Sequence, residues 1–166
     1  MAPLLLLLLV MTAASPRPYD DRIGAPAPPF TGTTGDGQTI TLADYRGKVV
    51  FLDFWASWCG PCRRELPYLG ELKRHFPEAS FEVIAINIDD EKANMNDFLK
   101  DIKPRIAFPV VFDPEKKLPA LYDIDSMPTS LVVDANGVVR YWHSGFKDSD
   151  KPRYLKEIET LLAETH

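Results

Sequence analysis

The chain has 166 residues, of which 45% are hydrophobic and 26% are charged, so it can bury one core and fits a single domain better than two. Its formal net charge is -5, and the sequence contains no basic stripe. Nucleic acid is therefore excluded as an expected partner, because phosphate binding requires clustered Lys and Arg.

The N-terminal residues have the pattern of a secretory signal. Residues 4–10, LLLLLLV, are all apolar and run into the small residues TAAS at 12–15. A membrane-spanning helix needs about 20 apolar residues, so this run is too short to be one. We expect a signal peptide over residues 1–15, cleaved near Ala14, and export to a bacterial periplasm. An uncleaved N-terminus that anchors the chain to the membrane is the alternative, because no Lys or Arg precedes the apolar run.

Two strand signals follow. Residues 25–47 are rich in Gly, Pro and Thr, and GDGQTITL at 35–42 predicts a hairpin turn followed by a short strand. KVVFLDFW at 48–55 is a nearly continuous apolar run, which is typical of a central strand buried on both faces.

A helix is expected to start at the two cysteines of the chain, Cys59 and Cys62. Its apolar residues recur at helical spacing along one face: Leu66, Leu69, Leu72 and Phe76. Pro67 lies inside this helix and should kink it.

The second half of the chain alternates strands and helices. Strands are expected at residues 81–89, 109–113, 130–134 and 138–142, and helices at 92–100 and 118–122. Asn136-Gly137 is the strongest short hairpin signal. A closing helix is indicated by apolar residues at helical spacing: Tyr154, Leu155, Ile158, Leu161 and Leu162. This order predicts an α/β fold with a mixed sheet and helices on both faces.

The cysteine motif, WCGPC at 58–62, favours redox chemistry. A helix N-terminus presents unpaired N–H groups and partial positive charge, which favour a thiolate at Cys59. Cys59 is then the nucleophile that attacks a substrate disulfide, and Cys62, one turn deeper, resolves the mixed disulfide. Pro61 suits the first helical turn, where its missing N–H costs nothing.

Other interpretations of the motif are weaker. A structural disulfide across so short a loop would constrain little of the unfolded chain. A zinc site normally needs four ligands, and the chain has no second CxxC and three histidines without HxxxH spacing. We therefore expect no metal and no cofactor other than a redox-active disulfide.

Several of these features together resemble the thioredoxin superfamily: FWASWCGPC, Pro67 five residues after Cys62, MPT at 127–129, and Gly145 after the hairpin. Residues 24–50 are similar to the N-terminal hairpin of exported TlpA-like and ResA-like thiol-disulfide oxidoreductases, which also carry an extra helix and strand, matched here by residues 90–113. The resemblance covers residues 24–166. It implies a thioredoxin-like three-layer α/β/α fold with a mixed central sheet, an N-terminal β-hairpin and a βα insert before a cis-proline.

Two acidic residues are candidate proton carriers. Asp53 interrupts an apolar strand, where burial should raise its pKa and let it exchange a proton with the Cys62 sulfur. Thioredoxins have an aspartate at the matching position, but the lysine that they place near it is matched by Ala85. Glu65 lies on the helix face of Cys62, and ResA-like proteins have an acid there. The alternative for both acids is an ordinary solvated carboxylate.

We expect substrate binding at the residues around the cysteines and at the proline loop: Trp58, Gly60, Pro61, Met127 and Pro128. In the family this proline is cis, and the backbone of the residue before it pairs with the extended substrate segment. Trp55, Trp58 and Phe146 either add apolar surface beside the sulfurs or belong to the core.

The Gly-Pro dipeptide between the cysteines is that of reducing thioredoxins, with potentials of about -270 mV, whereas strongly oxidising relatives lie near -120 mV. We expect an extracytoplasmic protein-disulfide reductase that acts on cysteine-containing exported proteins, for example apocytochrome c before haem attachment. Its electrons would come from a membrane thiol donor, and it would be a monomer.

Two alternatives are a peroxiredoxin-like peroxide reductase and a Cu(I)-handling module. Peroxiredoxins carry a PxxxTxxC pattern, but the matching positions here are Leu52 and Ala56. Copper would be held by Cys59 and Cys62, with Met127 as a conceivable third donor, because thiolates and thioethers are soft ligands.

Overall fold

The computed structural model describes residues 21–165. The expected signal peptide and the cleavage position at Ala14 lie outside the described residues. Within residues 21–165, no helix combines the length and the apolar character that crossing a membrane requires.

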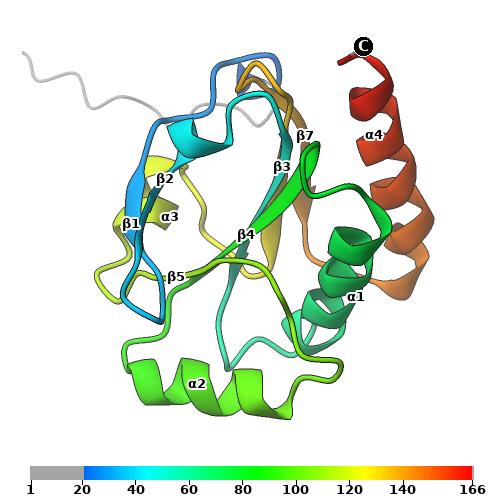
Figure 1. The fold of residues 1–166 in the computed structure, drawn as a ribbon. Helices are drawn as coiled ribbons and strands as arrows, with labels where there is room; N and C mark the ends of the chain where they lie inside the picture. Colours follow the sequence, from blue (N-terminus) through cyan, green and yellow to red (C-terminus); the bar gives the residue numbers. More distant parts are fainter. Residues whose placement is uncertain (1–20, 166) are drawn as a thin grey trace, which may run out of the picture.

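A five-stranded mixed sheet forms the centre of the molecule, in the order β5-β4-β3-β6-β7 (Figure 1). Its strands are β3 Val49–Trp55, β4 Phe81–Asn87, β5 Val110–Phe112, β6 Thr129–Val133 and β7 Val139–Ser144. Strands β3, β4 and β5 are parallel, whereas β6 pairs antiparallel with both β3 and β7. The expected mixed sheet is confirmed. Strands β3, β4 and β6 are buried at every residue, which explains their continuous apolar sequences.

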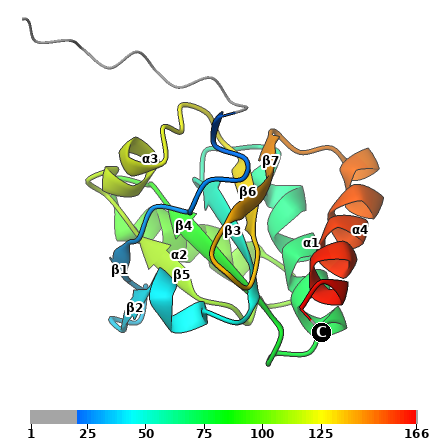
Figure 2. The same ribbon diagram turned by 90° about the horizontal axis from the view of Figure 1, so that it is seen from above.

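Helices cover both faces of the sheet, as expected. They are α1 Cys62–His75, α2 Lys92–Asp101, α3 Lys117–Leu121 and α4 Lys151–Ala163. Both views place α1 and α4 side by side on one face, with α3 and the β1–β2 hairpin on the other (Figures 1 and 2). Helix α1 continues through Pro67.

Strand β3 divides its side chains between two apolar clusters. Val49, Phe51 and Trp55 belong to the cluster that includes residues of α1, α2 and α4. Leu52 and Phe54 belong to the cluster under α3 and the hairpin. Because strand side chains alternate between faces, Asp53 has the parity of Phe51 and Trp55 and points toward α1 and α4.

The N-terminal hairpin is also confirmed. It consists of β1 Thr31–Thr33 and β2 Thr39–Thr41, followed by the short 3-10 helix η2 Leu42–Tyr45. The hairpin lies against β5, where the Gly35 N–H donates to the Val110 carbonyl oxygen at 2.9 Å. Helix α2 and strand β5 form the expected insert before the loop that contains Pro128. Strand β4 ends at Asn87, two residues earlier than the sequence predicted.

Gly32 is the point of closest approach between the hairpin and the sheet. A Cβ atom at Gly32 would lie 2.6 Å from Cγ1 of Val111, which is buried. We expect Gly32→Ala to lower the free energy of unfolding by about 1–3 kcal/mol, measured by urea denaturation, because two packed elements must separate. Gly60→Ala is the matched control, since a Cβ there meets no atom within 4 Å. Equal stability of Gly32→Ala and the parent would contradict this packing.

Candidate active site at the Cys59–Cys62 disulfide

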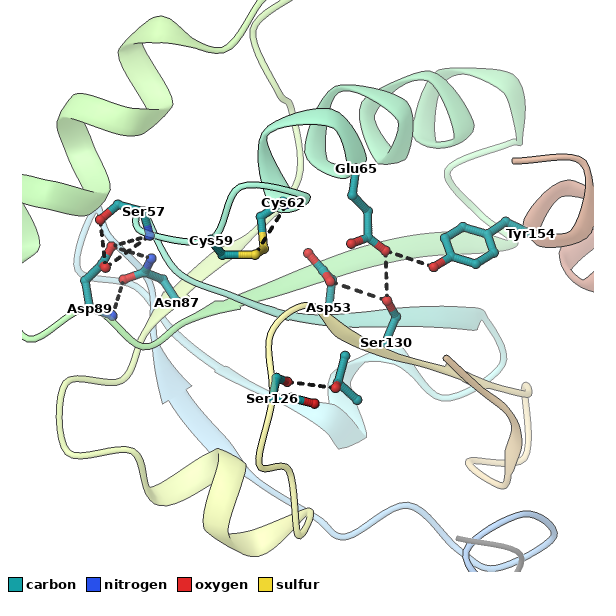
Figure 3. Close-up of a disulfide and its surroundings, with 11 residues drawn as sticks. Asp53, Ser57, Cys59, Cys62, Glu65, Asn87, Asp89, Ser126, Ser130 and Tyr154 are labelled. Atoms are coloured by element: carbon teal, nitrogen blue, oxygen red, sulfur yellow. Dashed lines mark hydrogen bonds between the residues drawn. A yellow bond between two sulfur atoms is a disulfide. The ribbon is translucent and has the colours of Figure 1, made fainter. Parts of the chain in front are cut away.

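Cys59 and Cys62 form a disulfide in the turn between β3 and α1 (Figure 3). Their Cα atoms are 5.4 Å apart. Helix α1 begins later than the sequence predicted, because Cys62 is its first residue and Cys59 precedes it. Cys62 is completely buried, whereas Cys59 keeps 4% of its surface exposed. A substrate sulfur can therefore reach Cys59 and not Cys62.

The electrostatics at the start of α1 favour negative charge on Cys59. The Cys62 N–H donates to Cys59 Sγ at 3.3 Å. An N–H group at a helix N-terminus stabilises a thiolate both through this hydrogen bond and through the helix dipole. The reduced protein thus has a chemical reason to ionise Cys59 first.

The three aromatic residues near the motif have different positions. Trp58, which directly precedes Cys59 in the sequence, is 69% exposed, whereas Trp55 and Phe146 are buried in the core. The ring of Trp55 packs on that of Phe98 with centroids 4.9 Å apart. Of these three side chains, Trp58 alone is available for contact with a substrate protein.

The Met127–Pro128 peptide bond is cis, as the resemblance implied. Strand β6 begins at the next residue, Thr129, which pairs with Phe54 near the end of β3. The proline loop therefore lies beside the strand that leads into the cysteine motif. The Gly145 N–H donates to the Pro128 carbonyl oxygen at 2.8 Å, which supports the loop from the end of β7.

Asp53 and Glu65 are both completely buried, so the solvated alternative is wrong for each of them. The Ser130 hydroxyl lies 3.4 Å from Asp53 Oδ1 and 3.0 Å from Glu65 Oε1. The Tyr154 hydroxyl donates to the same Glu65 oxygen at 3.0 Å. In Figure 3 the Asp53 carboxyl lies between the disulfide and the Glu65 carboxyl.

Burial raises the pKa of both carboxyl groups. Desolvation, reinforced by the neighbouring Glu65 carboxyl, raises the pKa of Asp53 well above its usual range. Desolvation raises the pKa of Glu65 to about 7, although hydrogen bonds from Ser130 and Tyr154 act in the opposite direction. Two acids that can hold or accept a proton near neutral pH are thus enclosed beside the buried cysteine.

Ser130 and Tyr154 were not recognised as site residues from the sequence, where they fit a strand and an apolar helix face. The pairing of β3 with β6 could have identified Ser130 as a site residue, because Ser130 is the direct partner of Asp53 in that pairing. Tyr154 comes from α4, about ninety residues further along the chain than Glu65. That proximity depends on the packing of α4 against α1.

A second polar cluster fixes the loop before Cys59. The Ser57 N–H and hydroxyl both donate to the Asp89 carboxylate, at 3.1 and 2.9 Å from Oδ1. The Asn87 side-chain amide donates to Asp89 Oδ2 at 2.9 Å. Asn87 and Asp89 are buried, so the end of β4 holds the turn that carries Trp58 and Cys59. The sequence analysis did not identify this cluster.

Comparison with known families shows a family match over most of the chain. The model of the AhpC/TSA family matches residues 23–142. The chain is also 35% identical over 138 residues to the thiol-disulfide oxidoreductase ResA of Geobacillus kaustophilus, covering 82% of this chain and 78% of the relative. It is 35% identical over 116 residues to ResA of Bacillus subtilis, covering 70% and 64% of the two chains.

Solved structures agree with this similarity. A Chlorobium tepidum protein described as a thiol:disulfide interchange protein, DsbE, superposes with a TM-score of 0.79 at 38% identity, covering 84% of this chain and 97% of the other. The exposed lipoprotein thioredoxin Etrx1 of Streptococcus pneumoniae gives a TM-score of 0.64 at 33% identity, covering 78% and 99%. The thioredoxin-like fold predicted from the sequence is confirmed.

Asp89→Asn tests the anchor of the loop. The neutral amide replaces charge-assisted hydrogen bonds from Ser57, so we expect the free energy of unfolding to fall by about 1–3 kcal/mol. Asp90→Asn is the matched control, because the neighbouring Asp90 is exposed and makes one surface ion pair with Lys116. Urea denaturation of both variants measures the difference, and equal stabilities would show that Asp89 does not hold the loop.

The raised pKa of Glu65 predicts a pH dependence of stability. The folded state binds a proton at Glu65 up to a pH of about 7, whereas the unfolded chain releases it near 4.5. The stabilisation is therefore complete below about pH 4.5 and lost as the pH rises to about 7, and it amounts to roughly 3 kcal/mol. Glu65→Gln should remove this share of the pH dependence in urea denaturation.

Glu71→Gln, an exposed acid on the same helix, provides the control for this experiment. It should leave the dependence of stability on pH as it is in the parent. A Glu65→Gln variant whose stability follows the parent curve from pH 4.5 to 7 would show that Glu65 ionises in the native state as it does in the unfolded chain.

Proposed function

Because this chain belongs to the AhpC/TSA family and, within the thioredoxin superfamily, to the ResA-like thiol-disulfide oxidoreductases, we propose that it reduces disulfides in exported proteins. The observation that carries the proposal is the asymmetry of the sulfur pair. Cys59 keeps a small exposed surface and receives an N–H donor, whereas Cys62 is completely buried on the side of two carboxyl groups with raised pKa values.

The reaction begins with the reduced dithiol. The Cys59 thiolate attacks one sulfur of the substrate disulfide, and the other substrate sulfur leaves and takes up a proton. The Cys62 thiol then loses its proton to the carboxyl pair, attacks Cys59 Sγ and releases the second substrate sulfur as a thiol. Two electrons pass from the dithiol to the substrate, and the Cys59–Cys62 disulfide forms.

The dipeptide between the cysteines supports the reducing direction. Gly60 and Pro61 are the residues found in thioredoxins with potentials of about -270 mV. A reductase of this kind needs a supply of electrons. We assign this supply to a membrane thiol donor that reduces the Cys59–Cys62 disulfide after each cycle. Apocytochrome c, which must present free cysteines for haem attachment, is a suitable substrate.

The contact surface for a substrate protein consists of Trp58, Gly60, Pro61, Met127 and Pro128. Trp58 and Gly60 are exposed, Pro61 and Met127 are half-buried, and Pro128 is buried, so Pro128 would act by shaping the backbone of the loop. This combination provides an apolar rim around Cys59. We assign the activity to one monomer over residues 24–166, exported after removal of residues 1–15, with no cofactor beyond the disulfide.

The alternative functions have less support. For a peroxide reductase, the positions of the expected Pro and Thr are Leu52 and Ala56, both completely buried and without a polar group to orient a peroxide. For a Cu(I)-handling module, the ligands would be Cys59, Cys62 and Met127, but Cys62 is completely buried and so is closed to an incoming ion.

Single-cysteine variants test the proposed roles. Cys62→Ser should accumulate a mixed disulfide between Cys59 and a substrate protein, visible as an added mass that dithiothreitol removes. Cys59→Ser should lose turnover on a protein disulfide by at least about a hundredfold, as expected when a nucleophile is removed. Full turnover by Cys59→Ser, or rapid turnover of peroxide by the parent, would refute disulfide reduction through Cys59.

A further inference from the structure

A row of polar residues crosses the buried sheet beneath α1 and α4. Asp53 on β3, Ser130 on β6 and His143 on β7 are successive partners in the strand register. On the other side of Asp53 its partner on β4 is Ala85. Within the sheet, polar groups therefore continue from Asp53 only toward β6 and β7. Glu65 on α1 and Tyr154 on α4 approach Ser130 from above the sheet.

The distances around Ser130 favour one assignment of protons. A serine hydroxyl has one proton, so it can donate to Asp53 or to Glu65 but not to both. The shorter distance, 3.0 Å, is to Glu65, and Tyr154 donates to the same oxygen. If the Ser130 proton is directed to Glu65, the 3.4 Å contact between Ser130 Oγ and Asp53 Oδ1 is a hydrogen bond when Asp53 is protonated and donates to the Ser130 oxygen.

This assignment agrees with the electrostatics. Hydrogen bonds from Ser130 and Tyr154 lower the pKa of Glu65, whereas the pKa of Asp53 is raised well above its usual range. Desolvation and the Glu65 carboxyl thus favour the protonated form of Asp53, and the two hydroxyl donors favour the ionised form of Glu65. The remaining carboxyl oxygens, Asp53 Oδ2 and Glu65 Oε2, are buried and have no hydrogen-bond partner among the described residues.

We propose that Ser130 and Tyr154 are positioning residues that make Glu65 the ionised member of the acid pair, and that Ser130 relays a proton from Asp53 to Glu65 when Cys62 is deprotonated. The inference rests on the proposed disulfide reduction, in which Cys62 must lose a proton. In thioredoxins a lysine lies near the matching aspartate, whereas this chain has Ala85 at that position. The relay through Ser130 gives the proton a route that does not need this lysine.

The relay moves one proton in total. The Asp53 O–H bond breaks as its proton passes to the Ser130 oxygen, and the original Ser130 proton passes to Glu65 Oε1. The Cys62 S–H bond then breaks, and its proton restores the acid form of Asp53. Cys62 has become a thiolate and Glu65 a neutral acid, so charge and protons balance.

Other charged groups face this cluster. Asp150, before α4, raises the pKa of Glu65. The Arg153 guanidinium lies 6.0 Å from the centre of the Tyr154 ring. His143 packs on Tyr154 with ring centroids 4.7 Å apart, and its Nε2 lies 2.7 Å from Glu157 Oε2. A change at Tyr154 must therefore keep the ring, so that these neighbours stay in place.

Tyr154→Phe and Ser130→Ala are the test variants, because each removes one hydroxyl donor to Glu65. The readout is the carboxyl carbon resonance of Glu65 in carbon-13-labelled oxidised protein, assigned by its loss in Glu65→Gln. In the parent the midpoint should be at a pH of about 7. In each variant we expect it to rise by about one pH unit, because a donor to a charged group is lost.

Tyr122→Phe is the matched control. Tyr122 is a buried tyrosine whose hydroxyl donates to the Pro28 carbonyl oxygen at 2.6 Å, within the apolar cluster on the other face of the sheet. It should leave the Glu65 midpoint unchanged. Ser130→Thr keeps a hydroxyl at the relay position and should restore the parent midpoint.

The pH dependence of mixed-disulfide resolution, followed by stopped flow, should shift upward in the same two variants. An unchanged Glu65 midpoint in both would overturn the positioning role. A shifted midpoint with an unchanged pH profile of resolution would overturn the relay. A parent protein that exchanges no disulfide at any pH would refute the proposed function alone, because the carboxyl titration is measured without a substrate.

Discussion

The enclosure of two carboxyl groups between the sheet and helices α1 and α4 is the constraint on which this site depends. Asp53 and Glu65 are withdrawn from water, and desolvation raises the pKa of both carboxyl groups, with the Glu65 carboxyl adding to the shift of Asp53. Both acids therefore hold a proton to a higher pH than solvated carboxyl groups do, Glu65 up to a pH of about 7. The apolar residues that seal the layer, Phe51 and Leu66 among them, thereby take part in the chemistry although they carry no reactive group.

The two sulfurs need opposite environments, and the start of α1 provides both over a single turn. In the proposed reaction Cys59 must ionise and be reached by a substrate, and it is the partly exposed sulfur of the pair, with an N–H donor from Cys62. Cys62 must stay protected until the mixed disulfide forms, and it is completely buried on the side of the acids. The order of attack follows from this difference in exposure and charge.

Anchors from the ends of β4 and β7 hold the turn and the proline loop in place. Asp89 binds the backbone and hydroxyl of Ser57 just before the motif, and Gly145 donates to the carbonyl oxygen of Pro128. A rigid frame limits the loss of entropy when a substrate segment binds, which benefits both affinity and rate.

The sequence by itself determined the order of strands and helices, the hairpins and the redox-active pair of Cys59 and Cys62, because local periodicity and the CxxC spacing depend on neighbouring residues. It identified Asp53 and Glu65 as candidates but left their exposure open. Only the tertiary structure decided that both are buried, that Ser130 and Tyr154 converge on Glu65, and that Asp89 anchors Ser57. The physical reason is that desolvation and hydrogen bonding between distant segments depend on how α1, α4 and the strands pack, and a single sequence does not encode that packing in any local pattern.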